Sequence, residues 1–190
     1  MSDPLNIGMF GGGGVGKTAI TLQYVKGEFT EGYVPTIEDS FSKSVPINGK
    51  AVTVDIIDTA GQDDFKEMRY RYYQSCDGFV LVYSVIDRSS LETIDELYND
   101  IMTARGDSKP IKCIIAGNKA DMKREDSIPI EEAQVLGNKF HCKVLETSAK
   151  TALNITELFE TLINDLLNLN NSNANSNGAS DKEGGCCSIL

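Results

Sequence analysis

Basic residues are scarce in this chain of 190 residues. Lysine and arginine together number 18, against 28 aspartates and glutamates, which leaves a formal net charge of −10 at pH 7. A nucleic-acid-binding protein needs a basic face that neutralises phosphates, so the charge balance argues against that class of partner. It argues equally against simple electrostatic attraction to an anionic membrane. We expect a monomer that binds no nucleic acid.

Other signals are missing as well. No apolar run approaches the ~20 residues that span a bilayer. The first residues lack the basic and apolar segments of a signal peptide, and Ser2 stands where myristoylation requires glycine, so we expect neither. The single histidine, His141, is expected at the surface or in a structural role. The five cysteines have no paired metal spacing, and the interior three are expected to pack as small apolar side chains in a reducing compartment: Cys76, Cys113 and Cys142.

Short apolar runs alternate with amphipathic segments along most of the chain. Strands are predicted at residues 5–10, 40–47, 51–57, 78–84, 111–117 and 143–146, and helices at 17–25, 89–104, 130–140 and from 155 onward. This alternation predicts an α/β fold with a six-stranded, mostly parallel sheet and helices on both faces. Asn48-Gly49 is typical of a type I′ hairpin, which makes 40–47 an antiparallel edge strand, and Pro46 suits that position.

The helix starts and the last segment carry signals of their own. Ser89 with Glu92 resembles a capping box, and Asn154 with Glu157 indicates the start of the final helix. After Leu169 the composition changes to asparagine, serine and glycine, with almost nothing to bury. We therefore expect a globular domain over residues 1–169 and a flexible tail over residues 170–190.

A glycine-rich loop carries the first functional signal. Residues 11–18, GGGGVGKT, match the pattern Gly-x-x-x-x-Gly-Lys-Thr between a predicted strand and a predicted helix. Glycines let backbone N–H groups turn inward around phosphate oxygens, and the helix N-terminus adds its positive dipole end. Lys17 supplies charge to the β and γ phosphates, and the Thr18 hydroxyl can ligate Mg²⁺. The alternative is a flexible turn, and the pattern does not choose between ATP and GTP.

A second motif indicates which base the bound nucleotide carries. Asn118-Lys119-Ala120-Asp121 follows the predicted strand 111–117 at its carboxyl end, where an open α/β sheet binds its ligands. The Asp121 carboxylate can accept from the ring N–H and the 2-amino group of guanine, a donor pair that adenine lacks. Alone, these residues could form an ordinary charged turn. Placed between the phosphate loop and Ser148-Ala149-Lys150, they predict guanine recognition.

Five stretches together resemble the Ras family of small GTPases, in order and spacing, from Leu5 to about Leu167. They are GGGGVGKT at 11–18, YVPTIED at 33–39, DTAGQ at 58–62, NKAD at 118–121 and SAK at 148–150. The resemblance implies a P-loop GTPase domain with Mg²⁺ as cofactor, GTP as substrate and GDP as product. It also implies three kinds of protein partner: an exchange factor, a GTPase-activating protein and downstream effectors.

The resemblance implies roles for single residues. Gln62 would orient the attacking water, with Lys17 and Thr36 completing the catalytic set. Mg²⁺ would be held by Thr18, Thr36 and, through water, Asp58. Phe29 would pack edge-on against guanine, unless it only anchors its loop. The implied nucleotide contacts are Gly13, Gly14, Val15, Gly16, Lys17, Thr18, Ala19, Phe29, Pro35, Thr36, Asp58, Thr59, Ala60, Gly61, Gln62, Asn118, Lys119, Asp121, Ser148, Ala149 and Lys150.

Partner binding is implied for the loop that resembles switch I. Its residues are Tyr33, Val34, Pro35, Thr36, Ile37, Glu38, Asp39, Ser40 and Phe41. Val34 and Phe41 depart from the usual aspartate and tyrosine, which leaves the identity of the effector open. The first arginine in the chain is Arg69, so neither the phosphate loop nor switch I supplies the arginine that accelerates hydrolysis. We expect an activating protein to supply it past Gly13.

The chain ends in Cys187-Ser188-Ile189-Leu190, a C-a-a-X pattern whose leucine predicts geranylgeranylation of Cys187. One lipid anchors a protein only marginally, and a polybasic second signal is excluded because Lys182 is the only cation after Asn168. We therefore expect palmitoylation of Cys186 and a location at the cytoplasmic face of a membrane, namely the plasma membrane. The alternative is a pair of exposed thiols at a disordered end.

Two other functions remain open at this point. A P-loop kinase or ATPase would share the glycine loop, but it would need an acceptor-binding lid and no guanine motif. Relative affinity for GTP and ATP separates these two. A pseudo-GTPase would hold GTP permanently and act as a membrane-tethered adapter, and Gln62, Thr36 and Gly13 argue against it. A GTP-hydrolysing switch in signal transduction fits every motif.

Overall fold

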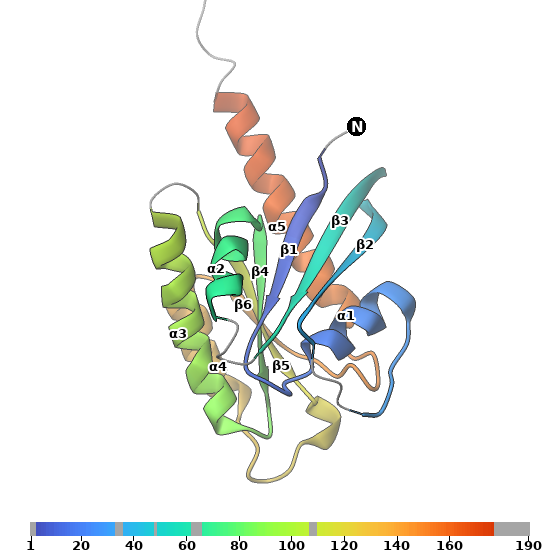
Figure 1. Ribbon diagram of the computed structural model, residues 1–190, viewed down its shortest axis with the longest axis vertical. Coiled ribbons are helices and arrows are strands. Elements are labelled where there is room, and N and C mark those ends of the chain that lie inside the picture. Colours follow the sequence, from blue (N-terminus) through green and yellow to red (C-terminus); the bar gives the residue numbers. More distant parts are fainter. Residues whose placement is uncertain (1–2, 33–35, 48, 62–65, 107–109, 177–190) are drawn as a thin grey trace, which may run out of the picture.

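The computed structural model describes residues 3–32, 36–47, 49–61, 66–106 and 110–176. They form a six-stranded sheet in the order β2-β3-β1-β4-β5-β6 (Figure 1). The strands are β1 (Leu5–Phe10), β2 (Glu38–Ile47), β3 (Lys50–Thr59), β4 (Gly78–Ser84), β5 (Lys112–Asn118) and β6 (Lys143–Glu146). β2 pairs antiparallel with β3, and the other neighbouring pairs are parallel. The expected sheet with one antiparallel edge strand is confirmed.

Helices cover both faces of the sheet, as expected. They are α1 (Lys17–Lys26), α2 (Lys66–Ser75), α3 (Arg88–Arg105), α4 (Ile130–Phe140) and α5 (Ile155–Ser176), with a short 3-10 turn, η3 (Ala120–Met122). α1 and α5 pack on one face, while α2, α3 and α4 pack on the other (Figure 1). Within the described ranges, no helix is both long and apolar enough to cross a membrane.

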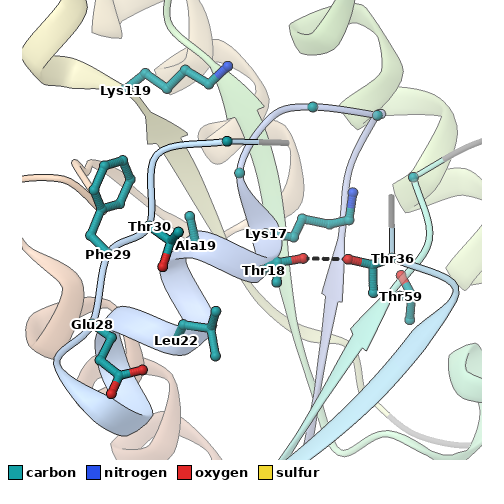
Figure 2. Close-up of a pocket in the computed structure, with 15 residues that line it drawn as sticks. Lys17, Thr18, Ala19, Leu22, Glu28, Phe29, Thr30, Thr36, Thr59 and Lys119 are labelled. Carbon is teal, nitrogen blue, oxygen red and sulfur yellow. Dashed lines mark hydrogen bonds between the residues drawn. The ribbon is translucent and has the colours of Figure 1, made fainter. Parts of the chain in front are cut away.

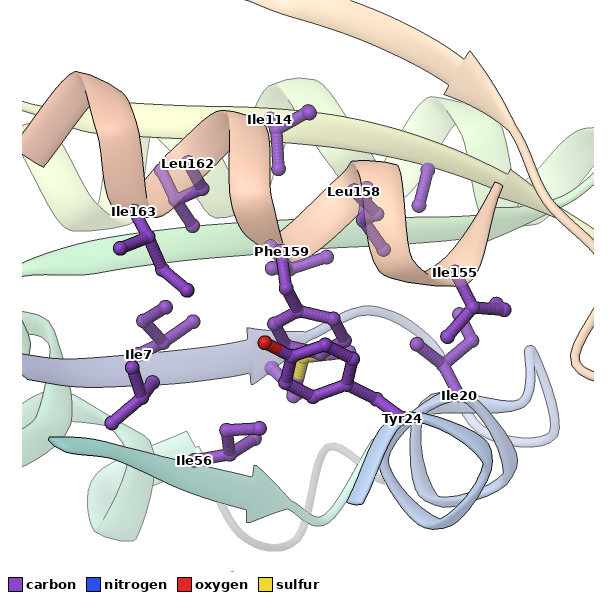
Figure 3. Close-up of a cluster of buried hydrophobic side chains, with 14 of the residues drawn as sticks. Ile7, Ile20, Tyr24, Ile56, Ile114, Ile155, Leu158, Phe159, Leu162 and Ile163 are labelled. Atoms are coloured by element: carbon purple, nitrogen blue, oxygen red, sulfur yellow. The ribbon is translucent and has the colours of Figure 1, made fainter. Parts of the chain in front are cut away.

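The core beneath α5 fixes the helix that follows the phosphate loop. Phe159 of α5 stacks on Tyr24 of α1, with ring centroids 4.0 Å apart and planes 18° apart (Figure 3). Burying a large apolar side chain stabilises a fold by about 1.5–3 kcal/mol. α5 therefore holds α1, and the loop before it, against the sheet. The apolar stripe predicted for the final helix is buried: Ile155, Leu158, Phe159, Leu162, Ile163 and Leu166.

The hairpin between β2 and β3 fits the predicted turn. Ile47 pairs with Lys50, which leaves a two-residue loop. Gly49 has φ 76°, the left-handed conformation that a type I′ turn requires. Pro46 lies on β2 at the edge of the sheet, where a missing N–H donor is tolerated. Asn48 lies outside the described residues.

One helix start differs from the sequence-based expectation, and a second agrees with it. α3 begins at Arg88, and Asp87 caps it by accepting a hydrogen bond from the Ser89 backbone N–H at 3.1 Å. A carboxylate at this position also complements the helix dipole, which explains the earlier start. Asn154 directly precedes α5, as expected, and its side-chain amide nitrogen donates to the backbone oxygen of Glu146 at 2.8 Å. That bond ties the start of α5 to the end of β6.

The expected flexible tail is wrong for its first residues, because α5 continues to Ser176. The boundary expected at Leu169 therefore falls inside a helix. Extending an existing helix gains one backbone hydrogen bond per added residue. Asparagine and serine disfavour that extension by only ~0.5 kcal/mol each. Residues 177–190 lie outside the described part of the chain.

α2 has no counterpart among the elements predicted from sequence. Its residues, KEMRYRYYQS, show no apolar stripe at helical spacing. Tertiary packing provides the stabilisation: Tyr73 is buried, with its ring centroid 5.0 Å from that of Phe10 on β1. A buried tyrosine ring therefore stabilises this helix, which the periodicity of aliphatic residues would not reveal.

Candidate nucleotide-binding site

Two adjoining hollows lie at the carboxyl ends of the parallel strands, where an open α/β sheet binds its ligands. The first, about 560 Å³, is lined by the phosphate-loop glycines and Thr36 (Figure 2). The second, about 380 Å³, is lined by Asp121 and Lys150. Phe29 and Lys119 line both, so the hollows form one groove with a phosphate end and a base end.

Most of the implied nucleotide contacts come together in this groove. Those that line it are Gly13, Gly14, Gly16, Lys17, Thr18, Ala19, Phe29, Thr36, Thr59, Gly61, Asn118, Lys119, Asp121, Ala149 and Lys150. Four others are buried beneath its walls and line neither hollow: Val15, Asp58, Ala60 and Ser148. Gln62 and Pro35 lie outside the described residues, as do Tyr33 and Val34 of switch I and the cysteines of the tail.

The phosphate loop joins β1 to α1 and needs glycine for reasons of space. Gly16 has φ 99°, and a Cβ there would lie 2.3 Å from Asn118 Nδ2. At Gly61, which faces the loop, a Cβ would lie 2.4 Å from the backbone oxygen of Gly12. Gly13 differs, because a Cβ there would meet no atom of the described residues within 4 Å. With respect to the described residues, Gly13 therefore borders open space at the groove, whereas Gly16 and Gly61 are confined.

Lys17 lies across the mouth of the loop. Its ammonium donates to the backbone oxygens of Gly11 at 2.9 Å and Gly12 at 2.8 Å. Burial lowers the pKa of Lys17 to about 8, although the nearby Asp58 carboxylate opposes the shift. A phosphate group would add the negative charge that stabilises the ammonium form. The two hydrogen bonds thus hold the ammonium group at the phosphate end of the groove.

Thr18, Thr36 and Asp58 converge beside Lys17. The Thr18 hydroxyl lies 2.8 Å from the Thr36 hydroxyl (Figure 2). It also donates to Asp58 Oδ2 at 2.5 Å. Asp58 is fully buried, and its Oδ1 has no hydrogen-bond partner among the described residues. Burial raises the pKa of Asp58 to about 6. Hard oxygen donors around an unpartnered buried carboxylate oxygen fit Mg²⁺.

Asn118 ties the phosphate loop to the loop after β6. Its amide nitrogen donates to the backbone oxygen of Val15 at 2.9 Å, and its amide oxygen accepts from the backbone N–H of Ala149 at 3.3 Å. The side chain is almost fully buried. Asn118 therefore connects the phosphate loop to the loop after β6 and fixes their relative positions.

Asp121 is oriented by a neighbour that lies far away in sequence. The buried Ser148 hydroxyl donates to Asp121 Oδ1 at 2.6 Å, and the same hydroxyl accepts from the backbone N–H of Thr151 at 3.1 Å. The carboxylate is thus held by one oxygen at the base end of the groove. This arrangement leaves Asp121 suited to accept a pair of donors on a flat ring.

The described part of switch I is joined to the end of β3 and to α2. The backbone N–H of Ala60 donates to the backbone oxygen of Ile37 at 3.2 Å. Glu38 accepts from Arg71 of α2 at 3.0 Å and from the Tyr72 hydroxyl. Ile37 itself is 64% exposed. Further along β2, Asp39 and Ser40 are exposed and Phe41 is half-buried.

Arg69 also belongs to this region, although the sequence assigned it no contact. It is buried, and its Nη1 donates to the backbone oxygen of Ala60 at 3.2 Å. Its guanidinium is close enough to contribute to the lowered pKa of Lys17. Arg69 therefore lies close to the phosphate end of the groove, although it lines neither hollow.

Several groove residues carry no motif and were missed by sequence reasoning. They are Leu22, Glu28, Thr30, Glu31, Gly32 and Met122. Glu31 pairs with Lys150 at 2.8 Å, which joins the loop after α1 to the base end of the groove. The only feature of the sequence that could have indicated these residues is their position between two recognised motifs or next to one.

Comparisons with known proteins agree with this geometry. The model of the Ras family matches residues 7–168. A Ras-like protein RAS2 from Hydra vulgaris is 42% identical over 84% of this chain and 83% of its own length. The Ras-related protein Ral-B from Rattus norvegicus is 38% identical over 83% of this chain and 77% of its own length.

A Ras-like protein 1 from Saccharomyces cerevisiae is 42% identical over 80% of this chain and 49% of its own length. The family match removes the kinase and ATPase alternatives, because it covers the phosphate loop and the guanine motif together. The chain belongs to the Ras family, whose members are GTP-binding switches that hydrolyse GTP.

Proposed function

We propose that this protein is a membrane-anchored GDP/GTP switch that binds effectors when GTP-bound and hydrolyses GTP slowly without an activating protein. The observation that carries the proposal is the convergence of Thr18, Thr36 and Asp58 beside Lys17. Three segments meet there that lie far apart in sequence, so the state of one phosphate group can govern all three.

At the phosphate end, Lys17 binds and orients the β and γ phosphates. Thr18, Thr36 and, through water, Asp58 would hold Mg²⁺, which neutralises phosphate charge when bound. The backbone of Thr36 and the N–H of Gly61 contact the γ-phosphate in this proposal. Losing that phosphate frees both loops, which is how hydrolysis would turn the switch off.

Hydrolysis depends on positioning. The Gln62 amide orients the attacking water, and an amide is too weak a base to do more, so the intrinsic rate is low. An arginine from an activating protein completes the site. The open space at Gly13 supports an approach from outside, and Arg69 is already engaged with the backbone of Ala60.

At the base end, Asp121 selects guanine and Phe29 packs against the ring edge. Because Ser148 holds one carboxylate oxygen of Asp121, the carboxylate meets the N–H and 2-amino donors of guanine without rearranging. Adenine would leave this carboxylate unpaired, which is the physical basis for rejecting it.

Effectors bind through residues 33–41 in this proposal, and an exchange factor opens the groove to release GDP. Ile37 offers an exposed apolar contact next to the charged Glu38 and Asp39.

In the same proposal, the C-terminal segment anchors the protein at the cytoplasmic face of the plasma membrane, through a geranylgeranyl group on Cys187 and a palmitoyl group on Cys186.

The central test compares nucleotides and hydrolysis on the purified chain. We expect tight binding of GTP and GDP, weak binding of ATP, and single-turnover GTP hydrolysis that a Ras-family activating protein accelerates. Asp121→Asn should shift preference from guanine toward xanthine, which presents an acceptor in place of the amino donor. Asp126→Asn, an exposed acid in the loop after η3, is the matched control and should leave preference unchanged.

Each failure has its own meaning. Unchanged GTP affinity in Asp121→Asn would remove the base assignment. GTP that stays intact with every activating protein tested would favour the pseudo-GTPase adapter.

Membrane fractionation of Cys186→Ser and Cys187→Ser tests the anchor. If Cys186→Ser stays in the membrane fraction to the same extent, a different second signal exists. Affinity capture with the GDP-loaded and GTP-analogue-loaded forms would identify the effectors.

A further inference from the structure

Two interior cysteines lie next to each other at the far edge of the sheet. Cys113 is on β5, and Cys142 immediately precedes β6. β5 and β6 are parallel neighbours in which Ile114 pairs with Lys143, so Cys113 and Cys142 stand one step before the first pair. Adjacent strands lie ~4.8 Å apart, within the Cα separations that a disulfide spans.

Both thiols also point to the same side of the sheet. Side chains alternate along a strand, so Cys113 shares a face with Ile115, and Cys142 shares one with Val144. Ile115 and Val144 are both buried in the core beneath α3 and α4, where Cys113 and Cys142 also pack. Strand spacing and orientation therefore place the two sulfurs together within the folded protein.

The surroundings give the two thiols different characters. Cys113 is buried, whereas Cys142 is half-buried at the end of α4. A hydrogen bond between the thiols raises the pKa of Cys113 and lowers the pKa of Cys142. Cys113 thus keeps its proton and directs it at the Cys142 sulfur. The more accessible Cys142 is the thiol that can ionise and react first.

We propose that Cys113 and Cys142 form an intramolecular disulfide when the protein meets a hydroperoxide, which makes the β5–β6 edge a redox-modification site. The Cys142 thiolate attacks a peroxide oxygen, the O–O bond breaks, and the released hydroxide takes up a proton to become water. The Cys113 sulfur then attacks the sulfenic sulfur of Cys142. The S–O bond breaks, and the leaving hydroxyl takes the Cys113 proton as a second water. Two thiols are oxidised by two electrons while one hydrogen peroxide is reduced to two waters.

The modification stands apart from the nucleotide site. Cys113 and Cys142 are at the amino ends of β5 and β6, while the groove lies at the carboxyl ends. The proposal therefore does not rest on the proposed function, and its readouts need no nucleotide turnover.

The test is peptide mapping of the 190-residue chain after treatment with hydrogen peroxide. Free thiols are alkylated under denaturing conditions, and the protein is cut with trypsin without reduction. The chain allows a clean result, because Cys113 falls in peptide 113–119, Cys142 in 140–143, Cys76 in 72–88, and both tail cysteines in 183–190. We expect peptide 113–119 linked to 140–143, while Cys76 remains an alkylated thiol.

Three variants establish the order of the steps. Cys113→Ser should stop the reaction at the sulfenic acid of Cys142, which dimedone traps. Cys142→Ser should leave Cys113 as a thiol, because Cys113 is buried and no neighbouring sulfenic acid is formed for it to attack. Cys76→Ser replaces a buried cysteine that is not part of the pair, and it should give the same cross-link as the unmodified sequence.

Thermal unfolding provides a second readout. The disulfide closes a loop of about 30 residues, and constraining the unfolded chain should raise Tm by roughly 5–10 °C, reversed by dithiothreitol. A fall in Tm would show that the bond forms only after local unfolding, and it would overturn the proposal. Absence of the linked peptide, or a link to Cys76 or to the tail in its place, would overturn it as well.

Discussion

Replacing Asn118 by alanine tests whether this side chain acts mainly as a link between loops. The residue belongs to the guanine motif, yet its amide contacts protein at both ends. The nitrogen donates to Val15 in the phosphate loop, and the oxygen accepts from Ala149 in the loop after β6. Asn118→Ala should therefore weaken binding at the phosphate end as well as at the base end.

The magnitude follows from the groups left without partners. Asn118 is buried, so its removal leaves the Val15 carbonyl and the Ala149 N–H without this partner in the interior. Each such group destabilises the protein by about 1–3 kcal/mol. The third contact, from the Thr147 hydroxyl at 3.4 Å, is long and adds little. The two costs sum to about 2–6 kcal/mol, which corresponds to roughly 30- to 25,000-fold in nucleotide release if all of it falls on the nucleotide-bound state.

The assay is displacement of a fluorescent GDP by excess unlabelled GDP, in parallel with release of an inosine diphosphate analogue. Inosine lacks the 2-amino group, so the two rates separate loss of a base contact from loss of loop geometry. Asn118→Ala should accelerate release of both nucleotides by similar factors and lower the thermal midpoint. Asp121→Ala, the control, should affect GDP more than the inosine nucleotide, because its carboxylate bonds to the missing amino group.

The reasoning would be refuted by one particular result. If Asn118→Ala accelerated GDP release but left the inosine nucleotide and the thermal midpoint unchanged, the amide would be a base contact only. The hydrogen bonds to Val15 and Ala149 would then contribute nothing measurable.

Three further perturbations have defined outcomes. Gly13→Val should keep nucleotide binding, because a Cβ meets no described atom within 4 Å, but it should abolish acceleration by an activating protein in a phosphate-release assay. A full response would contradict the proposed path of the arginine. Phe159→Ala should lower the free energy of unfolding by about 3–5 kcal/mol in urea titrations, because it leaves a cavity against Tyr24. Burial raises the pKa of the Cys76 thiol to about 12, so at pH 8 iodoacetamide should modify it slowly in the native protein and rapidly in urea; equal rates would mean that the thiol is accessible.

The fold was largely predictable because its signals are local. β4 and β5 are buried on both faces, so their apolar runs stand out from any neighbouring pattern. The edge strand β2 was found from its turn, Asn48-Gly49, although it begins two residues earlier than its alternation suggests. α2 escaped detection because the Tyr73 ring, packed against Phe10 of β1, helps to stabilise it, and this partner is distant in sequence.

The residues of the site could be predicted from the sequence, but the hydrogen bonds that connect them could not. Motifs named Asn118, Asp121 and Ser148, but their connections span long sequence separations that no local pattern encodes. The same holds for the pair between Glu31 and Lys150, which are 119 residues apart. A motif states which chemistry is available, whereas the fold decides which side chains contact the ligand and which hold the others in place.

The sheet also explains how a change at the phosphate could reach the protein surface. In the β2–β3 ladder, Asp39 pairs with Asp58 and Glu38 pairs with Thr59, so the exposed edge strand is one hydrogen-bonded step from the buried carboxylate. The charge of Asp39 adds to burial in raising the pKa of Asp58. In the proposed switch, a cation bound at Asp58 would offset that repulsion and hold Thr36, whose hydroxyl lies 2.8 Å from that of Thr18. The backbone hydrogen bond from Ala60 to Ile37 would then couple the segment around Thr36 to the loop that follows β3, so that in the proposed switch two neighbouring surfaces would respond to one event at the groove.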